Sequence, residues 1–231
     1  CSSDLCERIP SFDLVRFTNS GTEATLNTIR AARAVTGKSK IAKVEGGYHG
    51  SHDQVSVSVR VNPAKAGERS HPNAMAATEG LGEGTLEQVV VIPFNETTIA
   101  RETLESHKGG LAAVIIEPML GSVGMLPATT EFLTMLREFT AANGIILIFD
   151  EVISYRASSG GAQEYYGITP DMTSLGKIIG GGFSIGAFGG SKEIMDLYDP
   201  TQTGGPRVAH AGTFNANPVR SEEHTSELQS Q

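Results

Sequence analysis

The chain has 231 residues, of which 39% are hydrophobic and 19% are charged, and it carries a formal net charge of −8 at pH 7. This length fits one domain with a core of its own, and the acidic balance argues against a broad nucleic-acid surface. No apolar run approaches the roughly 20 residues that a membrane-spanning helix needs, so a membrane protein is not expected.

The two ends of the chain differ from the part between them. Residues 220–231 are polar and aperiodic and resemble a translated sequencing-library adapter, and residues 1–5 resemble the adapter of the opposite end. We therefore expect foreign ends and one partial domain over residues 6–219, cut from a longer protein. Two cysteines, Cys1 and Cys6, are too few for a disulfide scaffold and indicate a reducing compartment, the cytoplasm or an organelle matrix.

The first predicted unit is a strand, a turn and a helix. Residues 14–19 form the expected strand, residues 20–22 the turn, and residues 23–36 place apolar side chains on one helix face. Thr22 is expected to cap the start of this helix, and Gly37 its end. Such a turn can bind a phosphate through the free N–H groups of the helix start, although a plain cap is the commoner explanation of the pattern.

The next elements continue the alternation. Residues 41–45 predict a strand that ends in a glycine-rich turn with Tyr48, His49 and Gly50. Residues 62–84 are rich in Pro, Gly, Asn and Ser and predict a long surface excursion. Strand and helix signals resume over residues 89–93 and 97–107.

The clearest elements follow. Residues 111–116 and 145–149 are fully apolar, and the helix predicted between them, residues 129–143, is capped by Thr129 or Thr130. Apolar strands without alternation indicate burial on both faces, so the fold class is α/β with a mainly parallel, doubly wound sheet. Ligands bind beyond the carboxyl ends of such strands.

Three residues could carry chemistry, and two of them, Asp150 and Tyr48, lie just beyond predicted strands. Asp150 follows the most apolar strand, where a carboxylate needs a partner such as a protonated ring nitrogen. The alternative is that Asp150 or Glu151 caps a helix or forms a surface ion pair with a basic residue. Lys177 lies among apolar residues and glycines, a setting that lowers the pKa of an amine nucleophile, although most lysines are ordinary surface residues. Tyr48 is either an aromatic platform or a core tyrosine.

Other kinds of site are not supported. The segment around Lys177 is no P-loop, because Asp171 stands at the position of the first glycine and Ile178 follows the lysine. His49, His52 and His71 do not have convincing metal-ligand spacing, so no metal is expected.

Taken in order, the motifs resemble those of the class III aminotransferases, and among them the glutamate-1-semialdehyde 2,1-aminomutases and their relatives. The likeness covers nearly all of residues 6–219, and its most specific block surrounds Lys177. The motifs are NSGTEA from Asn19, YHG from Tyr48, EP from Glu117, FDEV from Phe149, GGAQEYYGITPDMTSLGKIIGGG from Gly160 and AGTFNANP from Ala211.

The resemblance implies the large domain of a fold type I transferase that depends on pyridoxal 5'-phosphate. By position, Lys177 would bind the cofactor covalently and move protons, and Asp150 would keep the ring nitrogen protonated. The remaining cofactor-binding residues are implied in the same way. Tyr48 and Val152 would pack on the two faces of the ring, Ser20, Gly21 and Thr22 would bind the phosphate, and Thr213 would reach the phosphate of a partner subunit in a homodimer.

Two departures concern the substrate rather than the cofactor. The family pattern T-G-F-R is replaced by Ile153-Ser154-Tyr155-Arg156, which lacks the glycine, and Ser122 stands where the aminomutases have Asn. The broken pattern resembles that of relatives that act on β-amino acids. The alternatives to an aminomutase are therefore a β- or ω-amino acid transaminase, a racemase or epimerase that uses the same lysine, and an inactive fragment.

Overall fold

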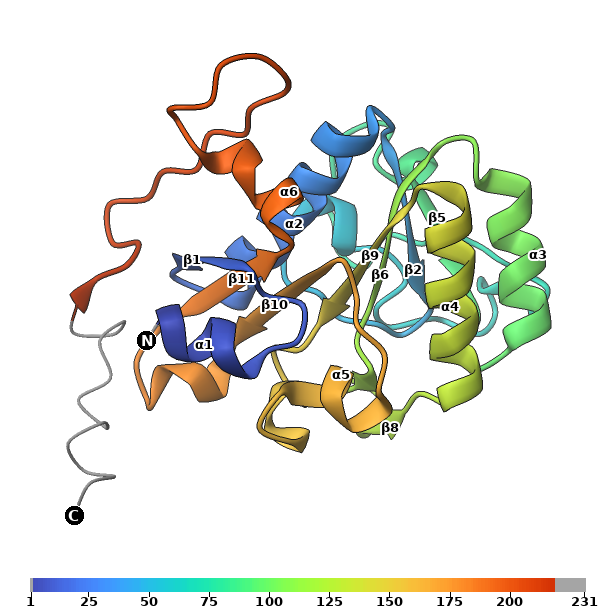
Figure 1. Ribbon diagram of the computed structural model, residues 1–231. Coiled ribbons are helices and arrows are strands. Elements are labelled where there is room, and N and C mark those ends of the chain that lie inside the picture. The colour runs from blue at the N-terminus through green and yellow to red at the C-terminus, as the bar shows by residue number, and fades with distance from the viewer. Residues whose placement is uncertain (1, 219–231) are drawn as a thin grey trace.

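A seven-stranded sheet runs through the middle of the protein (Figure 1). The computed structural model describes residues 2–218. The strand order is β1-β11-β10-β9-β6-β2-β5, and only β11 runs antiparallel to its neighbours. The strands are β1 (Leu14–Thr18), β2 (Lys40–Val44), β5 (Val89–Ile92), β6 (Leu111–Ile116), β9 (Ile146–Asp150), β10 (Met172–Gly176) and β11 (Gly186–Gly190).

Helices cover both faces of this sheet, so the predicted α/β fold with a mainly parallel, doubly wound sheet is confirmed. On one face α2 (Gly21–Thr36) and α6 (Lys192–Met195) contribute to a core with every second strand residue, including Ile41, Ile115 and Ile148. On the other face α3 (Thr97–His107) and α4 (Thr130–Asn143) pack on the alternate residues. Residues of β6 and β9 are buried throughout, as their apolar pattern predicts, and those of β10 are buried too.

Local chemistry explains where the two longest helices begin and end. The Thr129 hydroxyl accepts a hydrogen bond from the Phe132 N–H, and Gly144 ends α4 in the left-handed region. For α2 the prediction of Gly37 as the end is confirmed, but Thr22 as the cap is wrong. Ser20 is the capping residue, because its extended backbone precedes a helix that begins one residue before Thr22, at Gly21.

The predicted surface excursion is confirmed and contains little regular structure. It holds only the short strands β3 (Gly67–Glu68) and β4 (His71–Pro72), and its base is held by a bridge between Val57 and Ala76. Elsewhere β7 (Met119–Leu120) and β8 (Leu126–Pro127) form a small hairpin. The short helices are η1 (Asp53–Val55), η2 (Leu86–Gln88), η3 (Ser154–Ala157), α5 (Gly161–Tyr166), η4 (Lys177–Gly180) and η5 (Asp196–Tyr198).

The first described residues form α1 (Ser2–Arg8), which crosses the expected boundary between residues 5 and 6. Leu5 and Cys6 pack against a small core cluster with Ile9 and Phe12. The adapter-like tail, residues 220–231, lies outside the described residues. Within residues 2–218, no helix is long and apolar enough to cross a membrane.

Candidate functional site

Val152 joins two of the predicted site segments. A Cβ atom on Gly21 would lie 2.8 Å from the Val152 Cγ2 atom, and one on Gly176 would lie 3.3 Å from the Val152 Cγ1 atom. Val152 is therefore packed between the start of α2 and the residue before Lys177. These contacts gather the carboxyl ends of β1, β9 and β10 at one edge of the sheet, as expected for a ligand site in such a fold.

The turn that follows β2 rests on the first turn of α2. A Cβ on Gly50, whose φ is +106°, would lie 2.7 Å from the Thr22 Oγ1 atom, so only glycine allows this approach. The Thr25 hydroxyl donates to the His49 carbonyl oxygen at 2.6 Å. The segments around Ser20, Tyr48 and Asp150 are thus in one neighbourhood.

Asp150 is 3% exposed and has a ring nitrogen as its partner within the chain. His49 Nδ1 lies 2.9 Å from Asp150 Oδ2, and the imidazole donates, because a carboxylate only accepts. The second oxygen accepts from the Val152 N–H at 3.2 Å. The alternatives of a helix cap or a surface ion pair are therefore wrong for Asp150.

The adjacent Glu151 is also interior. It accepts hydrogen bonds from the Gln163 side chain, from the N–H groups of Gln163 and Ala162 and from the Ser154 hydroxyl. Burial raises the pKa of Glu151, and these donors oppose the shift. Glu151 thus anchors the segment between β9 and β10 through partners other than those of Asp150.

Lys177 lies at the start of η4, and its setting differs from the expected one. Its side chain is exposed, and its apolar neighbours Ile178 and Phe183 are 50% and 56% exposed. The close-packed apolar environment predicted from the sequence is therefore not formed by the described residues. The Lys177 backbone has a φ of +48°, a conformation rare for a residue other than glycine and concentrated at functional sites.

Tyr48 is 41% exposed, which rules out the alternative of a core tyrosine. Its N–H donates to Glu117 Oε1 at 2.8 Å. Val123 lies next to the same turn, since a Cβ on Gly46 would be 3.2 Å from the Val123 Cγ1 atom. One wall of the site thus presents an aromatic ring and an aliphatic side chain.

Ser20, Gly21 and Thr22 form the start of a helix of 16 residues, where the helix dipole favours an anion. The Ser20 hydroxyl accepts from the Glu23 N–H at 3.2 Å, so it is already a cap. Thr213 is exposed, and its segment is tied to this corner by a 3.0 Å hydrogen bond from Asn19 to Asn215.

Two charged residues at this edge were not singled out from the sequence as individual residues. Lys43 is fully buried, and its ammonium donates to the carbonyl oxygens of Val57 at 2.7 Å and Val44 at 3.2 Å. Burial lowers the pKa of Lys43 to about 7, and Glu117 and Glu45 oppose the shift.

Glu117 is the second of these residues. It was singled out from the sequence only as part of a motif, although it follows an apolar strand just as Asp150 does. A charged residue inside or directly after an apolar strand is the sequence pattern that identifies both Lys43 and Glu117.

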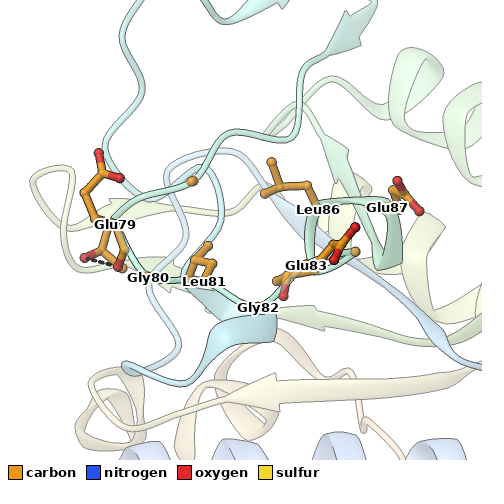
Figure 2. Close-up of a pocket in the computed structure, with 11 residues that line it drawn as sticks. Glu79, Gly80, Leu81, Gly82, Glu83, Leu86 and Glu87 are labelled. Atoms are coloured by element: carbon orange, nitrogen blue, oxygen red, sulfur yellow. Dashed lines mark hydrogen bonds between the residues drawn. The ribbon is translucent and has the colours of Figure 1, made fainter.

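A cavity of about 370 Å³ lies elsewhere, in the loop of residues 76–87 (Figure 2). Its walls include the carboxylates of Glu79, Glu83 and Glu87, and none of the predicted site residues lines it. Among the described residues, no group of three or more His, Cys, Asp and Glu could hold a metal ion.

Comparisons with known proteins agree with this geometry. The family description aminotransferase class-III matches residues 1–228. A glutamate-1-semialdehyde 2,1-aminomutase of Methanococcus vannielii is 46% identical over 219 residues, which cover 94% of this chain and 49% of the relative. The chain thus spans about half the length of the curated relatives it matches.

Solved structures of transaminases are also similar to this chain, again over about half of their length. An omega-transaminase from Sphaerobacter thermophilus is 52% identical with a TM-score of 0.91, over 95% of this chain and 50% of that one. A transaminase with PLP bound is 40% identical with a TM-score of 0.87, over 99% and 52%. Pyridoxal phosphate is the cofactor of these enzymes, and the chain belongs to the class III aminotransferase family.

Proposed function

We propose that the full-length protein transfers amino groups with pyridoxal 5'-phosphate, in the manner of a glutamate-1-semialdehyde 2,1-aminomutase. One observation carries the proposal: Lys177, Asp150, Tyr48 and the start of α2 belong to segments that contact one another at a single sheet edge. Each of these residue types suits a different part of the cofactor. The similarity to the aminomutase of Methanococcus vannielii supports the same activity.

The residues fit the cofactor chemically. The buried Asp150 carboxylate, oriented by His49, would accept a hydrogen bond from a protonated ring nitrogen. The start of α2 at Ser20–Thr22 would bind the phosphate, and Tyr48 and Val152 would hold the two faces of the ring. When bound, the cofactor supplies an electron-withdrawing ring that stabilises negative charge on the substrate.

Lys177 would have two tasks in turn. Lys177 is exposed and therefore accessible for covalent attachment of the cofactor, and the glycines that follow it leave room for a bulky ligand. With its amine free and neutral, the Lys177 Nζ atom would act as a general base and then as a general acid, moving a proton between carbon atoms at the site. A lysine can do both, because it is a flexible amine next to the reacting atoms.

Borohydride reduction of the full-length protein with the cofactor, followed by peptide mapping, tests the site. We expect the label on Lys177 and its loss in Lys177→Ala, while Lys192→Ala, a change of another exposed lysine, keeps it. A label on a different lysine would end the proposal. Product analysis tests the chemistry, because a racemase yields only the mirror image of its substrate whereas amino transfer yields a new amine.

A second candidate is a transaminase for β- or ω-amino acids. The observation that favours it is the segment Ile153–Arg156, which lacks the family glycine, together with Ser122. The omega-transaminase named above, at 52% identity, supports it too. An intermolecular transaminase needs a separate keto acid to regenerate its cofactor, whereas an aminomutase completes its reaction without one. Turnover with and without a keto acid therefore separates the two.

We also propose that the protein works as a homodimer in the cytoplasm or an organelle matrix, with Thr213 reaching the partner's cofactor phosphate. Exposed apolar side chains near the site support a covered surface, among them Ile178, Phe183 and Phe214. The substrate is an amino acid or an amino-aldehyde or keto compound, and neither nucleic acid nor membrane is an expected partner.

A further inference from the structure

Glu117 is a buried carboxylate for which the proposed chemistry has no task. It is 3% exposed and lies directly after β6, on the same edge of the sheet as Asp150. A carboxylate in this position is costly unless hydrogen bonds and positive charge compensate it. Its partners therefore indicate why it is there.

The partners come from two separate loops that flank the site. Glu117 Oε1 accepts from the Tyr48 N–H at 2.8 Å, and Oε2 accepts from the Gly121 N–H at 3.2 Å. The first donor belongs to residues 46–50, which we call the Tyr48 turn, and the second to residues 119–127, the Gly121 hairpin. One carboxylate thus bridges two loops that no strand pairing joins.

The Tyr48 turn and the Gly121 hairpin also contact each other directly. Val123, at the tip of the hairpin, lies against Gly46 of the turn, and a Cβ on Gly121 would lie 2.2 Å from the Ile153 Cδ1 atom. The hairpin therefore fits closely between the turn and the segment that follows Asp150. A small shift at Glu117 would move Val123 and Tyr48 relative to each other.

Charges on neighbouring strands act on the bridge. Burial is the main cause that raises the pKa of Glu117, and the negative charge of Asp150 adds to this effect. His49 and the two N–H donors lower the pKa and so oppose the shift. Lys43, buried on β2, is attracted by Glu117. The carboxylate therefore lies among His49, Lys43 and Asp150, with its oxygens engaged by backbone donors.

We propose that Glu117 is a positioning residue that fixes the separation of the Tyr48 turn and the Gly121 hairpin, so that Tyr48 and Val123 form one wall of the cofactor site. The part concerning the cofactor rests on the proposed function. The bridge itself is a property of this chain and can be tested without cofactor.

Amide hydrogen exchange in the cofactor-free full-length protein is the first measurement. In Glu117→Gln the single amide oxygen can replace only one of the two carboxylate oxygens, so we expect exchange to rise about tenfold or more at Tyr48 or at Gly121, whichever N–H faces the new NH2 group. Glu117→Asp keeps the charge but shortens the reach, so at least one of the two amides should lose protection. Glu164→Gln is the matched control, because exposed Glu164 accepts from the Gly160 N–H at 2.8 Å, and its loss should affect only that loop.

The visible circular dichroism of the bound cofactor is the second measurement. We expect both Glu117 variants to weaken cofactor binding about tenfold and to change the band as Tyr48→Ala does, with Glu164→Gln like the wild type. Unchanged exchange at the Tyr48 and Gly121 amides in both Glu117 variants would overturn the proposal. Raised exchange together with a wild-type circular dichroism band and wild-type cofactor affinity would overturn it as well. If the wild-type protein binds no cofactor, the proposed function is wrong, and the part of this proposal that concerns the cofactor fails with it. Amide hydrogen exchange still shows in that case whether Glu117 holds the two loops together.

Discussion

At the scale of single residues, the contact between His49 and Asp150 holds the most important carboxylate in place. Both side chains are almost completely buried, and the two residues are 101 positions apart in the chain. In His49→Leu, Asp150 would keep only the Val152 N–H, so we expect the free energy of unfolding to fall by about 1–3 kcal/mol. Urea denaturation of the full-length protein measures this loss, and cofactor titration should show weaker binding.

His71→Leu serves as the control for that variant, because His71 is exposed on the surface excursion. It should leave both measurements unchanged. A His49→Leu protein with wild-type stability and cofactor affinity would show that Asp150 does not depend on the imidazole.

Lys43 gives a prediction about pH. Burial lowers its pKa from 10.5 to about 7, so between these values the unfolded chain holds a proton that the folded protein releases. The contribution of Lys43 to the free energy of unfolding therefore rises with pH in this range, and below pH 7 the folded protein bears the full cost of a buried ammonium. Lys43→Met removes this linkage.

Thermal denaturation of the full-length protein from pH 6 to pH 9 tests the point. The stability of Lys43→Met relative to the wild type should be highest at pH 6 and should decrease as the pH rises through 7. A difference that stays constant across this range would mean that Lys43 keeps its charge in the folded protein.

The sequence could single out Asp150 and the start of α2 because each follows a strand whose pattern is local, and Lys177 because of the glycines and apolar residues around it. It could not supply the partner of Asp150, since His49 reaches it only through the fold. It also led to a wrong expectation for Lys177. The neighbours of this residue are apolar in sequence, but Ile178 and Phe183 point outward, and burial depends on what packs against them.

At the scale of elements, two helix starts with the same chemistry allow a matched comparison. Ser20 caps α2 at the candidate site, and Thr129 caps α4 on the opposite face of the sheet. Ser20→Ala and Thr129→Ala should each lower the free energy of unfolding by about 1 kcal/mol. Only Ser20→Ala should also weaken the binding of the phosphate-bearing cofactor, as measured by titration.

Equal cofactor affinities in these two variants would contradict the phosphate site at α2. The caps also show how far local patterns reach. The sequence predicts Gly37 correctly and gives Thr129 as one of two caps for α4, whereas Thr22 is predicted where Ser20 is the cap, since both residue types are good caps. The choice between them depends on where the backbone leaves β1, which is set by the packing of Gly21 against Val152.

At the scale of the whole molecule, the exposed apolar residues around Lys177 determine how the chain should behave alone. We expect the 231-residue chain to be poorly stable and inactive, because the proposed site needs a partner subunit and the rest of the full-length protein. Sedimentation and an activity assay, with the full-length protein as reference, measure this. A stable, active monomer would contradict both the partial domain and the shared site.

The pairing of β1 with β11 has a consequence for biosynthesis. Leu14 faces Gly190 across this pair, so the first strand of the sheet has no neighbour until almost the whole described chain has been made. At about 5–20 residues per second, the ribosome needs on the order of ten seconds or more to supply β11. During that time β1 has no pairing partner on the nascent chain, and an unpaired strand edge favours association with other chains.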